Sequence, residues 1–328
     1  MLDVWFGALR HGYRFARMLQ ADDLEEKGYH LAAQVLRLEP VVACNDVRAL
    51  AVAPEGRVVA WGRPLYRISR NRTYVRRPDR LLRDVRAVAA GTHHSLAVTA
   101  DGRVVAWGCN DHDQCDVPDD LPPVEAAAAG YYHSLAVTTD GRVVAWGDND
   151  YDQCAVPPDL PPVVTVVGSI TYSLALTVDG DVVAWGNGFP SDSCEVPTGL
   201  KAVAVAAGTS HALALTPEGQ VVAWGDNDYD QCAVPPDLPP AVAVAAGFCY
   251  SVALTATGDV VVWGKPWFPR GVLPGLKAVA VAACGIPLLT VTPEGRVVTW
   301  GHGSDRLCVA PSGLTVRVAP SGTPAGSA

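Results

Sequence analysis

Hydrophobic and polar residues alternate along most of this chain in short runs that predict β-strands. The stretch from residue 202 shows the pattern in full, with apolar or alternating runs over 202–207, 211–216 and 220–224. Between the second and third runs stands Glu218-Gly219, and glycine there suits the positive φ of a tight hairpin. The pattern therefore predicts antiparallel hairpins and not helices.

The same unit recurs through the chain, marked each time by Trp-Gly. The tryptophans follow one another at spacings of 46, 39, 39, 39, 39 and 37 residues, at Trp61, Trp107, Trp146, Trp185, Trp224, Trp263 and Trp300. A period near 39 is typical of propeller blades and solenoids. Residues 41–45 and 314–318 both match the first run of a unit, as expected if one end of the chain completes a blade begun at the other. We predict an all-β, seven-bladed β-propeller.

The repeats leave two terminal segments and one insertion. Residues 1–37 predict a small helical cap, which packs on the propeller or alternatively presents an exposed helix to a partner. The propeller is predicted to span 38–318, with an Arg-rich insertion at 63–86. Residues 319–328 are small, polar and rich in Pro and Gly, which predicts a disordered tail.

The units carry a family resemblance. The segments Gly91-Thr-His-His-Ser-Leu-Ala97, Gly130-Tyr-Tyr-His-Ser-Leu-Ala136 and Gly208-Thr-Ser-His-Ala-Leu-Ala214 each precede an acidic-Gly turn and Val-Val-Ala-Trp-Gly. They resemble repeats of the regulator of chromosome condensation family, over about residues 38–318. That family includes nucleotide-exchange factors, a plant ultraviolet receptor, ubiquitin-ligase modules and a secreted bacterial inhibitor of β-lactamases. The short units with Gln-Cys-x-Val-Pro loops are more similar to the bacterial inhibitor branch than to the exchange factors.

The resemblance also implies binding residues. In the inhibitor branch they come from the two positions before the His of Gly-x-x-His and from the loop after Trp-Gly. The matching positions here are Thr92, His93, Tyr131, Tyr132, Ile170, Thr171, Thr209, Ser210, Phe248 and Cys249, with His112, Tyr151 and Tyr229 in the loops. We expect the aromatic members, including His93, Tyr131, Tyr132 and Phe248, to form part of a binding surface.

Composition narrows the class of protein. Hydrophobic residues make up 49% and charged residues 18% of the 328 residues, which excludes a disordered chain, a coiled coil and collagen. No run approaches the ~18 apolar residues of a membrane span, and Asp3 and Arg10 interrupt the N-terminus where a secretory signal is unbroken. We expect a cytoplasmic protein with no membrane association. The nine Cys are expected to be reduced.

Charge is uneven along the chain. The net charge is −9, but residues 63–86 hold nine Arg and two Asp, which leaves −16 for the rest. Three interpretations of this insertion stay open. The acidic remainder argues against a nucleic-acid partner; Arg67, Arg70 and Arg72 suit an anionic small molecule held by bidentate contacts; or the insertion pairs with its own acidic surface or with a protein partner.

Divergence among the units suggests a second surface. Residues 143–162 and 221–240 are identical, which marks those blades as scaffold. The sixth, seventh and first units differ most, and a closed ring makes them neighbours. Their distinctive side chains are Trp267, Phe268, Arg270, His302, Asp305 and Arg306, a composition typical of interface hot spots.

Recurring His and Cys predict structure and not chemistry. His94, His133 and His211 share one repeat position, so a ring places them in separate blades, too far apart for the ~2 Å bonds of one zinc ion. Cys115, Cys154, Cys194, Cys232 and Cys308 share another position and are expected to pack as small buried side chains. The loops starting at Asp148 and Asp226 alternate carboxylates but lack the Gly of a calcium loop. We predict no metal and no cofactor.

The leading hypothesis is a non-enzymatic propeller, a scaffold or inhibitor-like module that presents one face to a protein partner. One alternative is an enzyme of a bacterial biosynthetic pathway with its site at the mouth of the central channel, where His302, Asp305 and Arg306 are the first residues to test. The other alternative, guanine-nucleotide exchange, rests on fold analogy.

Overall fold

A computed structural model gives the fold. It describes residues 42–44, 48–62, 73–77, 82–187, 195–265, 270–273, 275–283, 285, 287–300 and 310–316. The predicted helical cap and disordered tail lie outside these residues.

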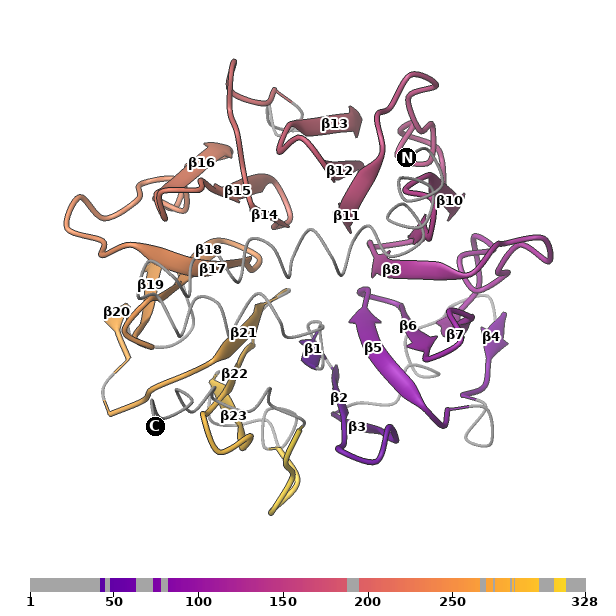
Figure 1. The fold of residues 1–328 in the computed structure, drawn as a ribbon, viewed down its shortest axis with the longest axis horizontal. Coiled ribbons are helices and arrows are strands. Elements are labelled where there is room, and N and C mark those ends of the chain that lie inside the picture. The colour runs from indigo at the N-terminus through magenta and orange to yellow at the C-terminus, as the bar shows by residue number, and fades with distance from the viewer. Residues whose placement is uncertain are drawn as a thin grey trace, which may run out of the picture.

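Seven antiparallel sheets radiate from a central axis as the blades of a propeller (Figure 1). The strands nearest the axis are β1 Val42–Cys44, β5 Val85–Ala90, β8 Val124–Ala129, β11 Val163–Gly168, β14 Ala204–Ala207, β17 Ala241–Ala246 and β21 Ala280–Ala283. The middle strands are β2 Arg48–Val52, β6 His94–Thr99, β9 His133–Thr138, β12 Tyr172–Thr177, β15 His211–Leu215, β18 Tyr250–Thr255 and β22 Leu288–Val291. The outer strands are β3 Val58–Gly62, β7 Val104–Cys109, β10 Val143–Gly147, β13 Val182–Gly186, β16 Val221–Gly225, β19 Val260–Gly264 and β23 Val297–Trp300.

Blades are numbered 1 to 7 in chain order. Blade 2 gains an outermost strand, β4 Tyr74–Val75, and blade 6 gains β20 Gly271–Val272. The predicted all-β propeller is confirmed. In blade 5 the three predicted strands are present, with ends that differ by up to two residues.

Apart from Arg48 in β2, the middle strands are buried along their whole length because they lie between two strands and between two blades. Small and branched apolar side chains from neighbouring blades fill the space between sheets in clusters, five of which each join two blades, while a sixth joins blade 1 to both blade 7 and blade 2. The hairpin glycines have the predicted geometry: Gly102, Gly141 and Gly219 have φ of 81°, 83° and 82°.

Both ends of the described chain contribute to the contact between blades 7 and 1. In blade 1, β1 is the inner strand, and Cys44 Sγ lies 3.5 Å from the carbonyl oxygen of Ala282 in blade 7. At the other end, Val316 donates its N–H to Gly295 O at 2.9 Å, as Val124 does to Gly102 O. Val316 thus occupies the place where the next blade begins, and it packs in one cluster with Val42. Closure therefore uses residues from both ends.

Candidate binding face

Two sets of loops share one face of the ring. His133 pairs with Gly147, so the start of a middle strand lies beside the end of the outer strand. The Gly-x-x-His segments and the loops after Trp-Gly therefore emerge at the same end of each blade, which we call the loop face. The acidic-Gly turns lie at the opposite end, the turn face.

The repeated histidines link successive blades below the loop face. Each imidazole Nε2 lies within hydrogen-bond distance of a serine Oγ in the next blade, in the pairs His94–Ser134 at 2.8 Å, His133–Ser173 at 3.0 Å and His211–Ser251 at 3.0 Å. The serines donate their single hydrogen to a loop carbonyl, so each serine oxygen must accept the hydrogen bond from imidazole Nε2–H. Burial lowers the pKa of His94 to about 3, and the pKa values of His133 and His211 to about 4. The three histidines thus lie in separate blades, as predicted.

Tyrosine replaces histidine in two blades, and its partner changes accordingly. The Tyr172 hydroxyl donates to His211 O at 2.7 Å, and the Tyr250 hydroxyl donates to Pro287 O at 2.8 Å. In the blade that each tyrosine faces, the position of the paired serine is held by Ala212 or Leu288. A histidine is therefore followed by serine in the next blade, and a tyrosine by an apolar residue.

The glutamine of each Gln-Cys loop provides the acceptor for these serines. Gln114 O accepts from Ser134 Oγ at 2.8 Å and from Trp146 Nε1 at 3.0 Å. Gln153 O accepts in the same way from Ser173 and Trp185. Trp146, Trp185 and Trp263 therefore anchor the loop of the preceding blade, a role that sequence reasoning missed.

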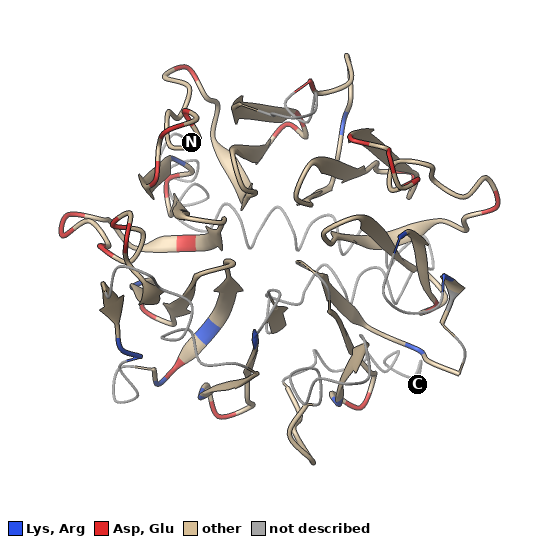
Figure 2. Ribbon diagram, turned by 180° about the vertical axis from the view of Figure 1, so that it is seen from behind, with Lys and Arg blue, Asp and Glu red and all other residues tan. Residues whose placement is uncertain are grey.

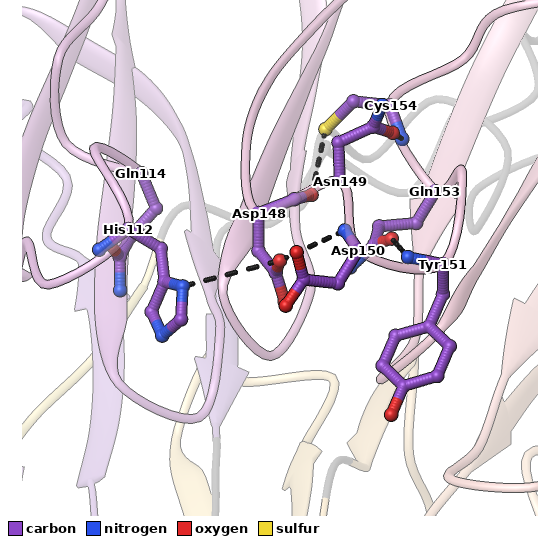
Figure 3. A network of polar contacts seen from close by, with 8 residues as sticks. All are labelled: His112, Gln114, Asp148, Asn149, Asp150, Tyr151, Gln153 and Cys154. Carbon is purple, nitrogen blue, oxygen red and sulfur yellow. Dashed lines mark hydrogen bonds and ion pairs between the residues drawn. The ribbon is translucent and has the colours of Figure 1, made fainter.

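Internal hydrogen bonds fix the shape of each acidic loop (Figure 3). Cys154 donates its N–H to Asn149 Oδ1 at 2.8 Å and its thiol to Asp148 O at 3.2 Å. Tyr151 donates its N–H to Gln153 Oε1 at 2.8 Å, and Asp152 has a φ of 59°. Burial raises the pKa of the Cys154 thiol to about 12. The carboxamide and thiol thus shape the loop, and the left-handed Asp152 agrees with its interpretation as a turn residue.

The residue at the first x position of each Gly-x-x-His segment, or at the matching position of the other blades, lines a cavity of about 150 Å³ at the axis. These residues, one from each of blades 2 to 7, are Thr92, Tyr131, Ile170, Thr209, Phe248 and Gly285. None of the described residues that line the cavity carries a charge. Phe248 remains 47% exposed. A small, mostly apolar side chain is therefore the kind of group that fits this cavity.

None of the described residues at the second x position lines the cavity, and in blades 2 and 3 these residues, His93 and Tyr132, are aromatic. His93 stacks on Tyr132 with ring centroids 4.6 Å apart, and Tyr132 in turn lies 4.5 Å from His112 in the loop of blade 2. Tyr131 meets both His93 and Tyr132 edge-on, at 4.7 and 4.6 Å. Three of the predicted binding residues, His93, Tyr131 and Tyr132, therefore form one aromatic cluster, and a fourth, His112, adjoins it at Tyr132.

Burial shifts the pKa values of the ionisable groups in this cluster. It lowers the pKa of His93 and raises the pKa of Tyr132, so both rings favour their neutral forms. At the edge, His112 Nδ1 lies 4.0 Å from Asp148 Oδ1 (Figure 3). The aromatic cluster thus presents neutral rings beside an acidic loop.

The acidic loops project outward around the loop face (Figure 2). Those of blades 3 and 5 are identical and hold the exposed rings of Tyr151 and Tyr229. Lys265, directly after β19, places its ammonium 4.3 Å from the centre of the Tyr229 ring.

Part of the Arg-rich insertion belongs to the propeller itself. Arg86 lies in β5, is largely buried, and donates from Nη2 to Val124 O at 2.6 Å and Glu125 O at 2.9 Å. Its guanidinium also lies 3.6 Å from the Glu125 carboxylate. For Arg86, pairing with the chain's own acidic surface is what the structure shows.

The other divergent residues are placed only in part. Arg270 is described and exposed, directly before β20. Trp267, Phe268, His302, Asp305, Arg306, Arg67, Arg70 and Arg72 lie outside the described residues. Among the residues that the structure describes, no group of three His, Cys, Asp or Glu could hold a metal ion. The same part of the chain contains no helix long and apolar enough to cross a membrane.

Comparison with known proteins agrees with these repeats. The model of the regulator of chromosome condensation (RCC1) repeat matches residues 85–114, 124–153, 202–231 and 241–266. Four stretches of this chain are thus similar to RCC1 repeats. A comparison with curated proteins finds no sequence match.

Solved structures share the propeller. Prp20p from Saccharomyces cerevisiae, whose structure is described with its binding to Gsp1p and histones, has a TM-score of 0.62 at 20% identity, covering 85% of this chain and 84% of that one. A chain in the crystal structure of Kap60 bound to yeast RCC1 (Prp20) has a TM-score of 0.61 at 23% identity, covering 74% and 75%. The CRINKLY WD40 ectodomain of the Arabidopsis thaliana receptor kinase ACR4 has a TM-score of 0.62 at 19% identity, covering 80% and 96%. These likenesses show the fold.

Proposed function

We propose that this chain is a non-enzymatic, protein-binding propeller that holds its partner on the loop face. The aromatic cluster, His93, Tyr131 and Tyr132, is the observation that carries the proposal. It gathers rings from two blades beside a cavity edged by Phe248. Aromatic side chains are enriched at interface hot spots because they bury large areas at little cost in conformational entropy.

The buried polar groups support a binding role over a catalytic one. The repeated histidines are fully buried and bonded to serines of the next blade, and burial raises the pKa values of the described loop cysteines Cys115, Cys154 and Cys232. A catalytic thiol needs a lowered pKa. The recurring His and loop Cys residues thus have structural partners, which supports their interpretation as structural residues.

The solved relatives make a protein partner plausible. Prp20p is described with its binding to Gsp1p and histones, and this chain shares that fold. The cytoplasmic location and the bacterial origin remain part of the proposal, as does the contribution of Trp267, Phe268, Arg270 and His302 to the surface.

The proposal is tested by comparing partner capture by the wild type, a loop-face variant and a turn-face control variant. Phe248 and Tyr151 are exposed on the loop face, and Val178, 51% exposed, lies on the turn face next to Asp179-Gly180. In a pull-down from lysate of the source organism, Phe248→Ala with Tyr151→Ala should lose a protein that the wild type and Val178→Ala both recover. Equal recovery by all three proteins would contradict the proposal.

A further inference from the structure

The chain contains one acidic loop twice, and among the described residues a cation lies over the tyrosine of one copy, Tyr229. Residues 143–162 and 221–240 are identical, and their backbones agree: Asp152 and Asp230 have φ of 59° and 61°. The hydrogen bonds of Tyr151 and Tyr229 to the glutamine two residues later measure 2.8 and 2.9 Å. The two loops therefore present their tyrosines in the same way.

The residue from the next blade distinguishes the copies. Lys265 donates its N–H to Cys249 O at 2.8 Å, and its ammonium sits over the Tyr229 ring. In the other copy Asn187 stands at the same position, with its N–H donated to Thr171 O at 3.0 Å. Asparagine is too short and carries no charge, so it cannot take the place of the lysine over Tyr151.

Tyr151 keeps the features that attract a cation. The residue is 44% exposed, its ring points away from the loop backbone (Figure 3), and its loop holds Asp148, Asp150 and Asp152. An ammonium or guanidinium over a tyrosine face is attracted by the ring quadrupole, and nearby carboxylates add to that attraction. Lys265 on Tyr229 is an internal example of the ligand that this loop accepts.

We propose that the Tyr151 loop is a subsite for a lysine or arginine side chain of a basic partner segment, which binds as Lys265 binds the identical loop around Tyr229. This inference rests on the proposed protein-binding function and names the chemistry of the partner. The net charge of −16 outside the Arg-rich insertion also favours a basic partner, because opposite charges attract.

Two exchanges across the repeat test the subsite. The probe is a short Lys-Gly repeat peptide, with a Gln-Gly peptide of the same length as its neutral control, and the readout is the NMR signals of isotopically labelled tyrosine rings. In the wild type the Lys peptide should shift the signal of Tyr151 more than that of Tyr229, because Lys265 already occupies one face of the Tyr229 ring. Asn187→Lys should reduce the shift at Tyr151 to the size seen at Tyr229, while Asn187→Gln should keep it. Lys265→Asn should increase the shift at Tyr229.

The expected loss of affinity for Tyr151→Ala is about two- to fivefold, the effect of an exposed cation–π contact. The subsite would be overturned if the Lys peptide does not shift the Tyr151 signal. It would also be overturned if the peptide shifts that signal equally in the wild type and in Asn187→Lys. A partner captured through Phe248 regardless of Asn187→Lys would overturn the subsite and leave the proposed function in place. A peptide that binds at Tyr151 of a chain that captures no protein would count against the proposed function alone.

Discussion

His133 Nε2 lies 3.0 Å from Ser173 Oγ, so a buried side chain of blade 3 bonds directly to blade 4. Because Ser173 donates its hydrogen to Gln153 O, the imidazole must donate from Nε2, and burial favours its neutral form. The same arrangement occurs between blades 2 and 3 and between blades 5 and 6. These bonds hold the Gly-x-x-His segments in place and thereby position the loop face.

The histidines predict a stability that falls with acid. Folding lowers the pKa of His133 to about 4, while an unfolded histidine titrates near 6.5. Between these values the unfolded chain binds more protons than the native chain, so the free energy of unfolding should fall as the pH falls from about 6.5 to about 4. Each such histidine contributes a slope of about 1.4 kcal/mol per pH unit. Urea unfolding at several pH values measures it, and a flat profile across this window would contradict the neutral, buried state.

Replacing the pair tests the rule that links successive blades. His133→Ala should lower the free energy of unfolding by about 2–4 kcal/mol, since it leaves a buried cavity and removes a hydrogen bond. His133→Tyr with Ser173→Ala copies the combination of Tyr172 with Ala212 and should recover most of that loss. It should also reduce the slope with pH by the share of one histidine. Urea unfolding of both variants decides, and a double variant no more stable than His133→Ala would refute the rule.

The loop thiols should react slowly. Burial raises the pKa values of Cys154 to about 12 and Cys232 to about 11, and alkylation requires the thiolate. At pH 8 iodoacetamide should label these two residues at least about tenfold more slowly in the native chain than in urea. Peptide mapping by mass spectrometry follows each site, and equal rates in both states would show that the thiols are not held in the loop.

Arg86 and Arg103 should differ in their effect on stability. Arg86 is largely buried and donates to two carbonyls of the next blade, so Arg86→Ala should cost about 1–3 kcal/mol. Arg103 pairs with Asp101 at 3.0 Å, but its side chain is 69% exposed, and Arg103→Ala should change stability by less than about 1 kcal/mol. Thermal unfolding compares them, and equal effects would contradict a structural role for Arg86.

The sequence predicted the ring because its signal is periodic. Trp-Gly and the hairpin glycines repeat in phase, so Trp146 and Gly141 take the same places in blade 3 as Trp185 and Gly180 take in blade 4. The separation of the histidines followed from the same repeat. The identity of their partners did not, because His133 and Ser173 lie 40 residues apart and meet only between blades. One sequence signal could have identified these partners. Where tyrosine replaces histidine, the serine position of the next blade holds Ala212 or Leu288 instead.

The candidate surface was predicted less completely. Strand ends decide which residue of Gly-x-x-His turns to the axis, so the separation of Tyr131, which lines the cavity, from Tyr132, which does not, needed coordinates. The contact of Lys265 with Tyr229 depends on the angle between two blades. No sequence pattern fixes that angle.

Photo-crosslinking from single positions tests the protein-binding loop face most directly. A photoreactive phenylalanine at position 248 replaces a ring that is already exposed at the cavity, and the same residue at position 178 probes the turn face. In cells of the source organism, the account predicts a discrete protein adduct from position 248 and none from position 178. Adducts that are the same from both positions, or none from position 248, would contradict it.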